Sequence, residues 1–352
     1  MQAILGVFFH FLGGFASGSF YIPYKKVKGW SWESYWIIGG LFSWLLIPFL
    51  AASLTIPNFM SIIRATDGQT LFYTYLMGLL WGIGGLTFGL SMRYLGLSLG
   101  MSVALGFTAA FGALVPPIYR DLFTTDTANT FSGMASTTSG QLVLLGVVIC
   151  LGGIVICGKA GIFKERELSV EQKQDSIKEF NIRKGLIVAP ISGILSACFN
   201  FGIEAGKPMA KVAVDQGADP LFQNNVIFVV LLWGGLTTNL LWCLVLNARN
   251  RSFADYTNSK LPLLPNYIFA ALAGTIWFLQ FFFYGMGESK LGNGASSWIL
   301  HMAFIILVSS MWGIALKEWK GVSKRTFRTI LLGIATIILS VIVVGYGNSL
   351  AE

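Results

Sequence analysis

Charge is scarce in this chain. Asp, Glu, Lys and Arg make up 11% of the 352 residues, whereas hydrophobic residues make up 55%. A soluble globular domain carries about 25% charged residues, and a soluble protein of this length could not bury so much apolar surface. The composition therefore argues against a soluble protein and indicates that membrane lipid covers much of the surface.

Cysteine and histidine are also few, with four and two copies. All four cysteines lie within apolar segments, and no Cys-x-x-Cys or Cys/His ligand spacing is present. We therefore expect neither disulfides nor a bound metal. Because no phosphate-binding loop, nucleophile elbow or zinc-protease motif is present either, we expect no cofactor and no enzymatic activity.

Long apolar runs dominate instead. A membrane crossing takes about 20 apolar residues in a helix, and ten runs reach about that length. The predicted fold is an all-α integral membrane protein with ten transmembrane helices. The predicted spans cover residues 2–22, 33–54, 70–92, 97–119, 141–160, 185–205, 223–247, 263–287, 294–316 and 327–347.

The basic residues predict how these spans are oriented. Of the 24 Lys and Arg residues, all but five lie in or beside the loops that follow odd-numbered spans. This distribution indicates that the basic residues orient the helices in the membrane and do not form a nucleic-acid-binding surface. The positive-inside rule places those loops in the cytoplasm, with both termini on the periplasmic side. The five exceptions are Arg64, Arg120, Lys207, Lys211 and Lys290.

The sequence also contains signs of two related halves. A polar stretch at 161–184 divides the spans five and five, so we expect five-helix repeats at 1–160 and 185–352 joined by a cytoplasmic linker. "GFASGSF" in the first span matches "GILSACF" in the sixth, and Trp81 in the third span aligns with Trp277 in the eighth. Because each half has an odd number of spans, the repeats must be inverted, as in many secondary transporters.

Both histidines fall inside predicted spans. His10 lies roughly 12 Å and His301 roughly 10 Å from the same membrane face at helical rise. Buried ionisable groups in membranes usually line a cavity or a proton path, and histidine titrates near physiological pH. The sequence therefore favours sugar binding and proton coupling by His10 and His301, although a structural hydrogen bond between helices would also explain each.

Aromatic and amide side chains near the predicted midplane suggest a ligand site. Trp81 and Trp277 lie roughly 15 Å from either surface, where they either stack on a flat ligand such as a sugar or fill the core of the bundle. Gln280 and Tyr284 share a helical face with Trp277, and Asn200 lies in the sixth span. Such amide, phenol and imidazole groups suit a neutral polyol.

Two carboxylates near span ends are rival proton carriers. Glu33 opens the second span, where it would act as a favourable charge at a helix N-terminus. Glu204 lies three residues before Lys207 near the end of the sixth span, which favours an interfacial ion pair.

Several stretches resemble the L-rhamnose–proton symporter (RhaT) family of the drug/metabolite transporter superfamily. They include "FYIPYKKVKGWSWESYW", "MRYLGLSLGMSVALG", "EFNIRKGL", "WFLQFFFYGMGESK", "SWILHMAF" and "LKEW", in this order. The resemblance implies a multi-pass bacterial inner-membrane protein with duplicated five-helix halves that takes up a sugar with a proton. It also supports the placement of His10 and His301.

The expected function is proton-coupled uptake of L-rhamnose or a closely related sugar, with the small sugar, the proton and membrane lipid as partners. We expect a monomer or a weak homo-oligomer. An exporter or exchanger of another small metabolite is the alternative within the superfamily. An enzyme acting on lipid-linked sugars is disfavoured, because the spans lack clustered carboxylates and a metal-ligand set.

Overall fold

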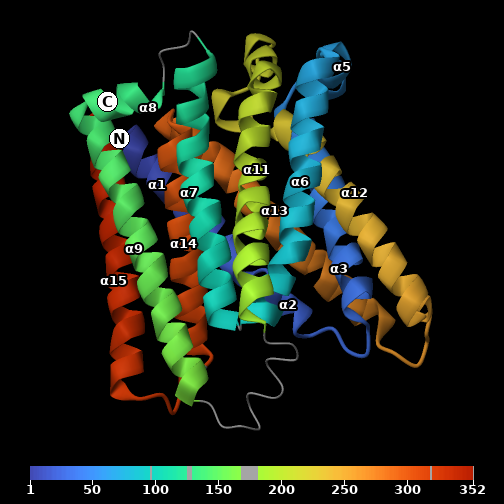
Figure 1. The fold of residues 1–352 in the computed structure, drawn as a ribbon. Helices are drawn as coiled ribbons and strands as arrows, with labels where there is room; N and C mark the ends of the chain where they lie inside the picture. The colour runs from blue at the N-terminus through green and yellow to red at the C-terminus, as the bar shows by residue number, and fades with distance from the viewer. Residues whose placement is uncertain (96, 125–128, 168–180, 318, 352) are drawn as a thin grey trace.

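The protein is a bundle of long helices (Figure 1). The structure, a computed structural model, describes residues 1–95, 97–124, 129–167, 181–317 and 319–351. Within these residues the regular structure is helical throughout, and ten helical segments are long and apolar enough to cross a membrane. The prediction of an all-α protein with ten candidate membrane-spanning helices is confirmed.

The elements follow the predicted spans closely in order. The first half contains α1 (Gln2–Ser19), α2 (Tyr21–Tyr24), α3 (Trp32–Leu41), the π-helical turn η1 (Phe42–Leu46), α4 (Ile47–Thr55), α5 (Phe59–Ala65), α6 (Gly68–Leu95), α7 (Leu97–Phe123), α8 (Phe131–Ser136) and α9 (Thr138–Glu167). The second half contains α11 (Ile182–Asp215), the 3₁₀ turn η2 (Pro220–Phe222), α12 (Asn225–Asn250), the 3₁₀ turn η3 (Ser252–Tyr256), α13 (Leu263–Leu291), α14 (Gly294–Ala315) and α15 (Lys324–Ser349).

Several helices are longer than the predicted spans. The helix α11 has 34 residues and contains Pro208, whereas the predicted span ended at residue 205. Similarly, α9 continues to Glu167 and takes in the first residues of the predicted linker; residues 168–180 of that linker lie outside the described part of the chain. Hydropathy marks only the apolar part of a helix, and a helix continues beyond it until its backbone hydrogen bonding is interrupted.

The second predicted span is interrupted by the π-helical turn η1. Pro48 stands directly after this turn, in the first residues of α4. Proline lacks the N–H that would bond to the carbonyl four residues earlier, and its ring crowds that carbonyl. A wider turn before the proline relieves this conflict, and a hydropathy pattern contains no signal for it.

Figure 1 distinguishes two ends of the bundle, which we name by the segments they carry. Both termini and α8 lie at one end, which we call the terminal face. The end of α9 and the start of α11 lie at the opposite end, the linker face. Each long helix runs from one face toward the other, so residue number along a helix gives depth.

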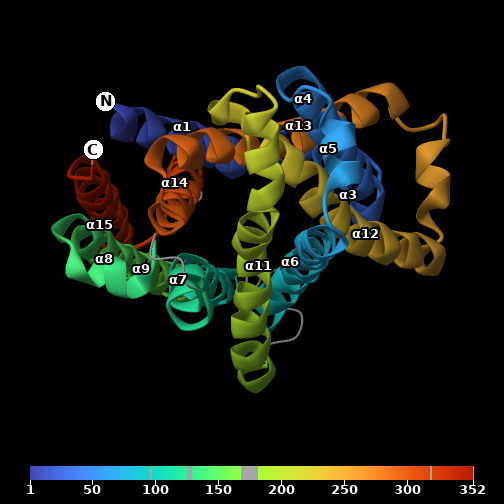
Figure 2. The same ribbon diagram turned by 90° about the horizontal axis from the view of Figure 1, so that it is seen from above.

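The two halves interlock through reciprocal contacts. The first helix of the first half, α1, packs against α13 and α14 of the second half. The first long helix of the second half, α11, packs in the same way against α6 and α7 of the first half. The last helices of the halves, α9 and α15, pack against each other at one edge of the bundle (Figure 2).

Glycine allows the close contact between α9 and α15. A Cβ atom at Gly153 would lie 2.6 Å from Cγ1 of Ile337 and 3.2 Å from its backbone nitrogen. A Cβ atom at the neighbouring Gly152 would have no heavy atom within 4 Å. Of these two adjacent glycines, only Gly153 faces α15, so Gly152 is a suitable control for substitutions at Gly153.

We predict that Gly153→Leu destabilises the protein, because overpacking a tight contact typically costs about 1–3 kcal/mol. Gly152→Leu should leave the melting temperature in detergent unchanged or slightly higher, since leucine favours helix more than glycine by up to about 1 kcal/mol. Thermal unfolding of the two purified variants measures this difference. An equal effect of both substitutions would contradict the packing described here.

Candidate functional site

The two histidines meet in the interior of the bundle. The ring centroids of His10 on α1 and His301 on α14 lie 6.2 Å apart. The ring of Tyr284 on α13 lies 5.4 Å from that of His10 and 5.2 Å from that of His301. All three side chains are buried. The structure thus brings together three of the residues predicted from the sequence.

Glycines on the neighbouring helices make room for these rings. A Cβ atom at Gly287 of α13 would lie 2.7 Å from Nε2 of His10, and one at Gly13 of α1 would lie 3.2 Å from Cε1 of His301. Both distances are shorter than ordinary van der Waals contact. The imidazoles therefore occupy space that any other residue at these two positions would restrict.

Hydrogen bonds connect the cluster and its neighbours to the middle of α7. The hydroxyl of Tyr284 donates to Oδ1 of Asn200 at 2.9 Å, and Nδ2 of Asn200 donates to the carbonyl of Gly112 at 2.8 Å. The indole N–H of Trp298 donates to the carbonyl of Thr108 at 2.9 Å. These bonds connect α13 and α11 to α7, and α14 to α7.

Several buried polar atoms in and beside this group of side chains have no hydrogen-bond partner in the protein. They are Nδ1 and Nε2 of His10, Nδ1 of His301, Nε2 of Gln280 and Oγ of Ser297. Leaving a buried polar group unpaired costs about 1–3 kcal/mol, and native proteins contain few such groups. We name His10, Asn200, Gln280, Tyr284 and His301 the imidazole cluster; its free donors and acceptors match a polar, uncharged ligand.

The predicted tryptophans lie in an adjoining aromatic cluster. The rings of Trp81 on α6 and Trp277 on α13 lie 6.4 Å apart, and both contact the fully buried Trp44. Phe281 contacts Trp81 at 5.7 Å. Since Gln280 stands between Trp277 and Phe281 on α13, the aromatic cluster borders the imidazole cluster along one helix.

Glu204 takes part in an ion network near the terminal face. Its pairing with Lys207 across one turn, predicted from the spacing, is confirmed at 3.0 Å. Glu204 also pairs with Arg120 of α7. Lys207 bonds at the same time to Glu288 of α13 at 3.2 Å, and Nδ2 of Asn224 donates to Glu288 at 2.9 Å. Glu288 was not predicted from the sequence, in which only its position one helical turn after Tyr284 points to it.

Glu33 lies near the linker face, far along the bundle from the histidines. It stands in the first turn of α3, as predicted, and is buried. The same carboxylate oxygen accepts from Oγ of Ser252 at 2.6 Å and from Nδ2 of Asn250 at 3.0 Å. Glu33 thus joins α3 to the end of α12. Among the described residues, no group of three or more His, Cys, Asp or Glu side chains is placed to hold a metal ion.

A cavity of about 410 Å³ lies in the linker-face half of the bundle. Ile305 and Ile306, one turn beyond His301, line its inner part, and Ser17 of α1 and Ser309 of α14 line it further along. It therefore extends from the neighbourhood of the imidazole cluster toward the linker face.

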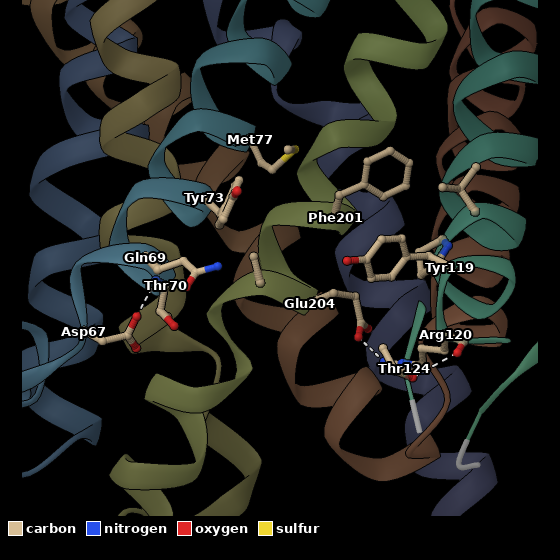
Figure 3. Close-up of a pocket in the computed structure, with 13 residues that line it drawn as sticks. Asp67, Gln69, Thr70, Tyr73, Met77, Tyr119, Arg120, Thr124, Phe201 and Glu204 are labelled. Carbon is tan, nitrogen blue, oxygen red and sulfur yellow. Dashed lines mark hydrogen bonds and ion pairs between the residues drawn. The ribbon is translucent and has the colours of Figure 1, made fainter. Parts of the chain in front are cut away.

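A second cavity, of about 610 Å³, lies near the terminal face between α6, α11 and α7 (Figure 3). Tyr119, Arg120 and Glu204 are among its lining residues, and Figure 3 shows the Arg120–Glu204 pair at its edge. Asp67, just before α6, also lines it. The backbone amide of Thr70 donates to Asp67 at 2.8 Å and lowers the pKa of that carboxyl below its usual range.

Comparison with known proteins identifies the family. The family described as L-rhamnose-proton symport protein (RhaT) matches residues 1–350. The chain is 37% identical over 348 residues to the L-rhamnose-proton symporter of Klebsiella pneumoniae, covering 97% of each chain. It is 38% identical over 349 residues to that of Pectobacterium carotovorum, covering 98% of each chain, and 37% identical over 348 residues to that of Escherichia coli, covering 97% of each. The chain belongs to the RhaT family of L-rhamnose-proton symport proteins.

Proposed function

We propose that this protein is a secondary active transporter that carries L-rhamnose together with a proton into the cell across a bacterial inner membrane. Family membership along nearly the whole chain supports this function. Within the molecule, the observation that carries it is the imidazole cluster, in which four side-chain nitrogens of three residues are buried and have no partner. A neutral sugar with several hydroxyls supplies both donors and acceptors to such groups.

Each member of the imidazole cluster has a role in sugar binding. His10, His301 and Gln280 hydrogen-bond the sugar hydroxyls through the nitrogens that the protein leaves free. Tyr284 and Asn200 are already bonded to each other, so they position the imidazoles. Because no formal charge faces the site from these five side chains when the histidines are neutral, the site favours an uncharged ligand.

The aromatic cluster supplies an apolar wall. Deoxy sugars present C–H groups that pack on aromatic rings, and Trp277 and Phe281 flank Gln280 on the same helix. Trp81 comes from the other half of the chain and contacts Trp277. We therefore assign Trp81 and Trp277 to the side of the sugar that lacks hydroxyl contacts.

The proton is carried by His301 with His10 beside it. Protonating either imidazole turns its free nitrogen into a donor and places a positive charge near the other ring, so both cannot be protonated at once without a large cost. A sugar hydroxyl that accepts from the protonated ring stabilises it, which links the two substrates. Glu33 and Glu204 are less suitable carriers, because protein groups already bond their carboxylates and neither lies beside the cluster.

The helix contacts support an inverted repeat with five helices in each half, 1–160 and 185–352. In each half the first span packs against the third and fourth spans of the other half: α1 on α13 and α14, and α11 on α6 and α7. A pseudo-twofold axis in the membrane plane relates such pairs. With basic residues concentrated toward the linker face, this face is cytoplasmic and the terminal face is periplasmic.

Cavities lie on both sides of the imidazole cluster. The one of about 610 Å³ near the terminal face is bordered by the ion network that joins α7, α11 and α13, whereas the one of about 410 Å³ begins one turn beyond His301 and extends toward the linker face. We assign this arrangement to an inward-facing state, with the linker-face cavity as its open side. Sugar would leave through this cavity. Transport then requires the terminal side to open and this cavity to close in alternation.

We predict that His301→Gln abolishes accumulation of L-rhamnose against its gradient. Glutamine keeps hydrogen-bonding capacity but does not titrate, so exchange of labelled for unlabelled sugar should continue. Uptake in cells with and without an uncoupler, together with counterflow in vesicles, measures the two activities. Accumulation that stays normal and uncoupler-sensitive would contradict the coupling role, and loss of counterflow would show that His301 is needed for binding itself.

Trp277→Ala should raise the KM for L-rhamnose at least tenfold, because it removes the aromatic face, whereas Trp277→Phe should restore most of the affinity. The control is Trp242→Ala, since Trp242 is exposed on the surface of α12. Initial rates of labelled sugar uptake over a range of concentrations give the KM of each variant. Equal KM values for Trp277→Ala and Trp242→Ala would show that Trp277 does not contact the sugar.

The orientation predicts the behaviour of C-terminal fusions. Alkaline phosphatase attached after residue 352 should be active, since it folds in the periplasm, and green fluorescent protein attached there should be dark. Enzyme activity and fluorescence of the two fusions in growing cells give the answer. An inactive phosphatase and a bright fluorescent fusion would reverse the orientation.

A further inference from the structure

We propose that the groove between α7 and α9 binds one phospholipid with an anionic headgroup, with an acyl chain in the groove and the phosphate against Lys159 and Arg325. This inference goes beyond the proposed function, because it concerns the outer surface of the bundle and uses neither the identity of the sugar nor the orientation of the chain. It rests on the shape and lining of the groove and on two cations at its end.

The groove is a cavity of about 580 Å³ bordered by α7 and α9. These two helices pack against each other at the edge of the bundle (Figure 2). Val155, one of the lining residues, is 68% exposed, so the groove opens on the outer surface of the bundle. In a protein whose helices cross a membrane, this surface meets lipid.

The lining of the groove suits a hydrocarbon chain. Of its eleven residues, only Ser102 and Lys159 have polar side chains. On the α7 side, the rings of Phe107 and Phe111 stack with their centroids 5.8 Å apart. A wall of this kind leaves the polar groups of a sugar or another polar solute without hydrogen-bond partners, which is unfavourable. An acyl chain is the occupant that this lining favours.

Two glycines show where α7 and α9 touch and where they leave space. A Cβ atom at Gly158 of α9 would clash with Oγ of Ser102 on α7, so the helices touch there. A Cβ atom at Gly106 of α7 would have one heavy atom within 4 Å, Cγ2 of Ile154 at 4.0 Å. Gly106 therefore leaves open the space that forms the groove.

The length of the groove matches one leaflet of a bilayer. Its lining runs from Ser102 to Phe111 on α7 and from Leu151 to Ile162 on α9. At helical rise these stretches are about 14 Å and about 17 Å long, and half of the hydrocarbon core of a bilayer is about 15 Å thick. An acyl chain that enters at the linker-face end therefore reaches the bilayer midplane within the groove.

Two cations lie at the linker-face end of the groove. Nζ of Lys159 lies 5.9 Å from the ring centroid of Phe163, and the guanidinium of Arg325, in the first turn of α15, lies 4.9 Å from the same centroid. Phe163 follows Lys159 by one turn, so the ammonium extends toward the linker face. Among the ion pairs that join described residues, none involves either cation.

These cations lie at the level of the lipid headgroups. The apolar run of α9 ends at residue 160 and that of α15 begins at residue 327, next to Lys159 and Arg325. Basic residues at a membrane surface attract anionic lipids, and a guanidinium group binds phosphate through paired hydrogen bonds. Charge complementarity at this end of an apolar groove therefore selects an anionic phospholipid.

Thermal unfolding measures this binding, because a ligand that binds only the folded protein raises its melting temperature. The delipidated protein is heated in detergent with added dioleoyl phosphatidylglycerol or, at the same mole ratio, dioleoyl phosphatidylcholine. The anionic lipid should raise the melting temperature by about 4 °C more than the zwitterionic lipid. Addition of about 0.5 M NaCl should reduce this difference by more than half, because salt screens the contact with the phosphate.

Variants separate the headgroup contact from the chain contact. Lys159→Ala and Arg325→Ala should each lose at least half of the preference for the anionic lipid, and Lys159→Arg should keep it. Lys260→Ala is the matched control, since Lys260 is an exposed residue of the loop before α13 that lines none of the three cavities.

Gly106→Leu fills the groove and should lose at least half of the stabilisation by the anionic lipid. Its control is Gly152→Leu, because a Cβ atom at Gly152 would have no heavy atom within 4 Å and this residue lies outside the lining. Glycerol 3-phosphate, which carries the phosphate without an acyl chain, should leave the melting temperature unchanged.

Equal stabilisation of the parent chain by the two lipids, or an unchanged preference in either alanine variant, overturns the proposal. Full stabilisation of Gly106→Leu, or an equal effect of glycerol 3-phosphate, would show that no acyl chain occupies the groove and also overturns it. If Gly106→Leu does not fold, the variants of the exposed Lys159 decide the question. The assay contains no sugar, so its failure leaves the proposed symport function in place.

Discussion

The contact between His10 and His301 is the feature on which the rest of this structure depends. Two imidazoles lie side by side in a region that lipid and packed helices shield from water, and three of their four nitrogens lack protein partners. Glycines at 13 and 287 leave space for the rings, and the bond between Tyr284 and Asn200 fixes their surroundings. The proposed binding of a neutral polar molecule would relieve the cost of these unpaired nitrogens.

The interactions between helices differ on the two sides of this contact. Toward the terminal face, the ion network ties α7, α11 and α13 together, and hydrogen bonds to the carbonyls of Gly112 and Thr108 join α11 and α14 to the middle of α7. Toward the linker face, a cavity is bordered by α1, α7, α9, α14 and α15 and is lined mostly by apolar and serine side chains, with Lys164 among them.

Much of this arrangement could be predicted from the sequence, because it depends on local patterns. Apolar run length predicted the ten candidate spans, and depth along two helices placed His10 and His301 at a similar level, where the structure shows their rings side by side. The spacing of Glu204 and Lys207 predicted their ion pair. Glu288 and Trp298 were missed, because their partners Lys207 and Thr108 lie on other helices, and the rotation of one helix against another is set by packing that the sequence does not display. The π-helical turn before Pro48 was missed for a local reason, because a hydropathy pattern does not show how a proline changes the backbone hydrogen bonding before it.

The most direct test of this account is an experimental structure of the protein with L-rhamnose bound. We predict that sugar hydroxyls lie within hydrogen-bonding distance of the free nitrogens of His10, His301 and Gln280, with Trp277 against a face of the ring that carries C–H groups. Sugar bound elsewhere, with the two imidazoles still lacking partners or bonded only to protein groups, would contradict the central role of this contact.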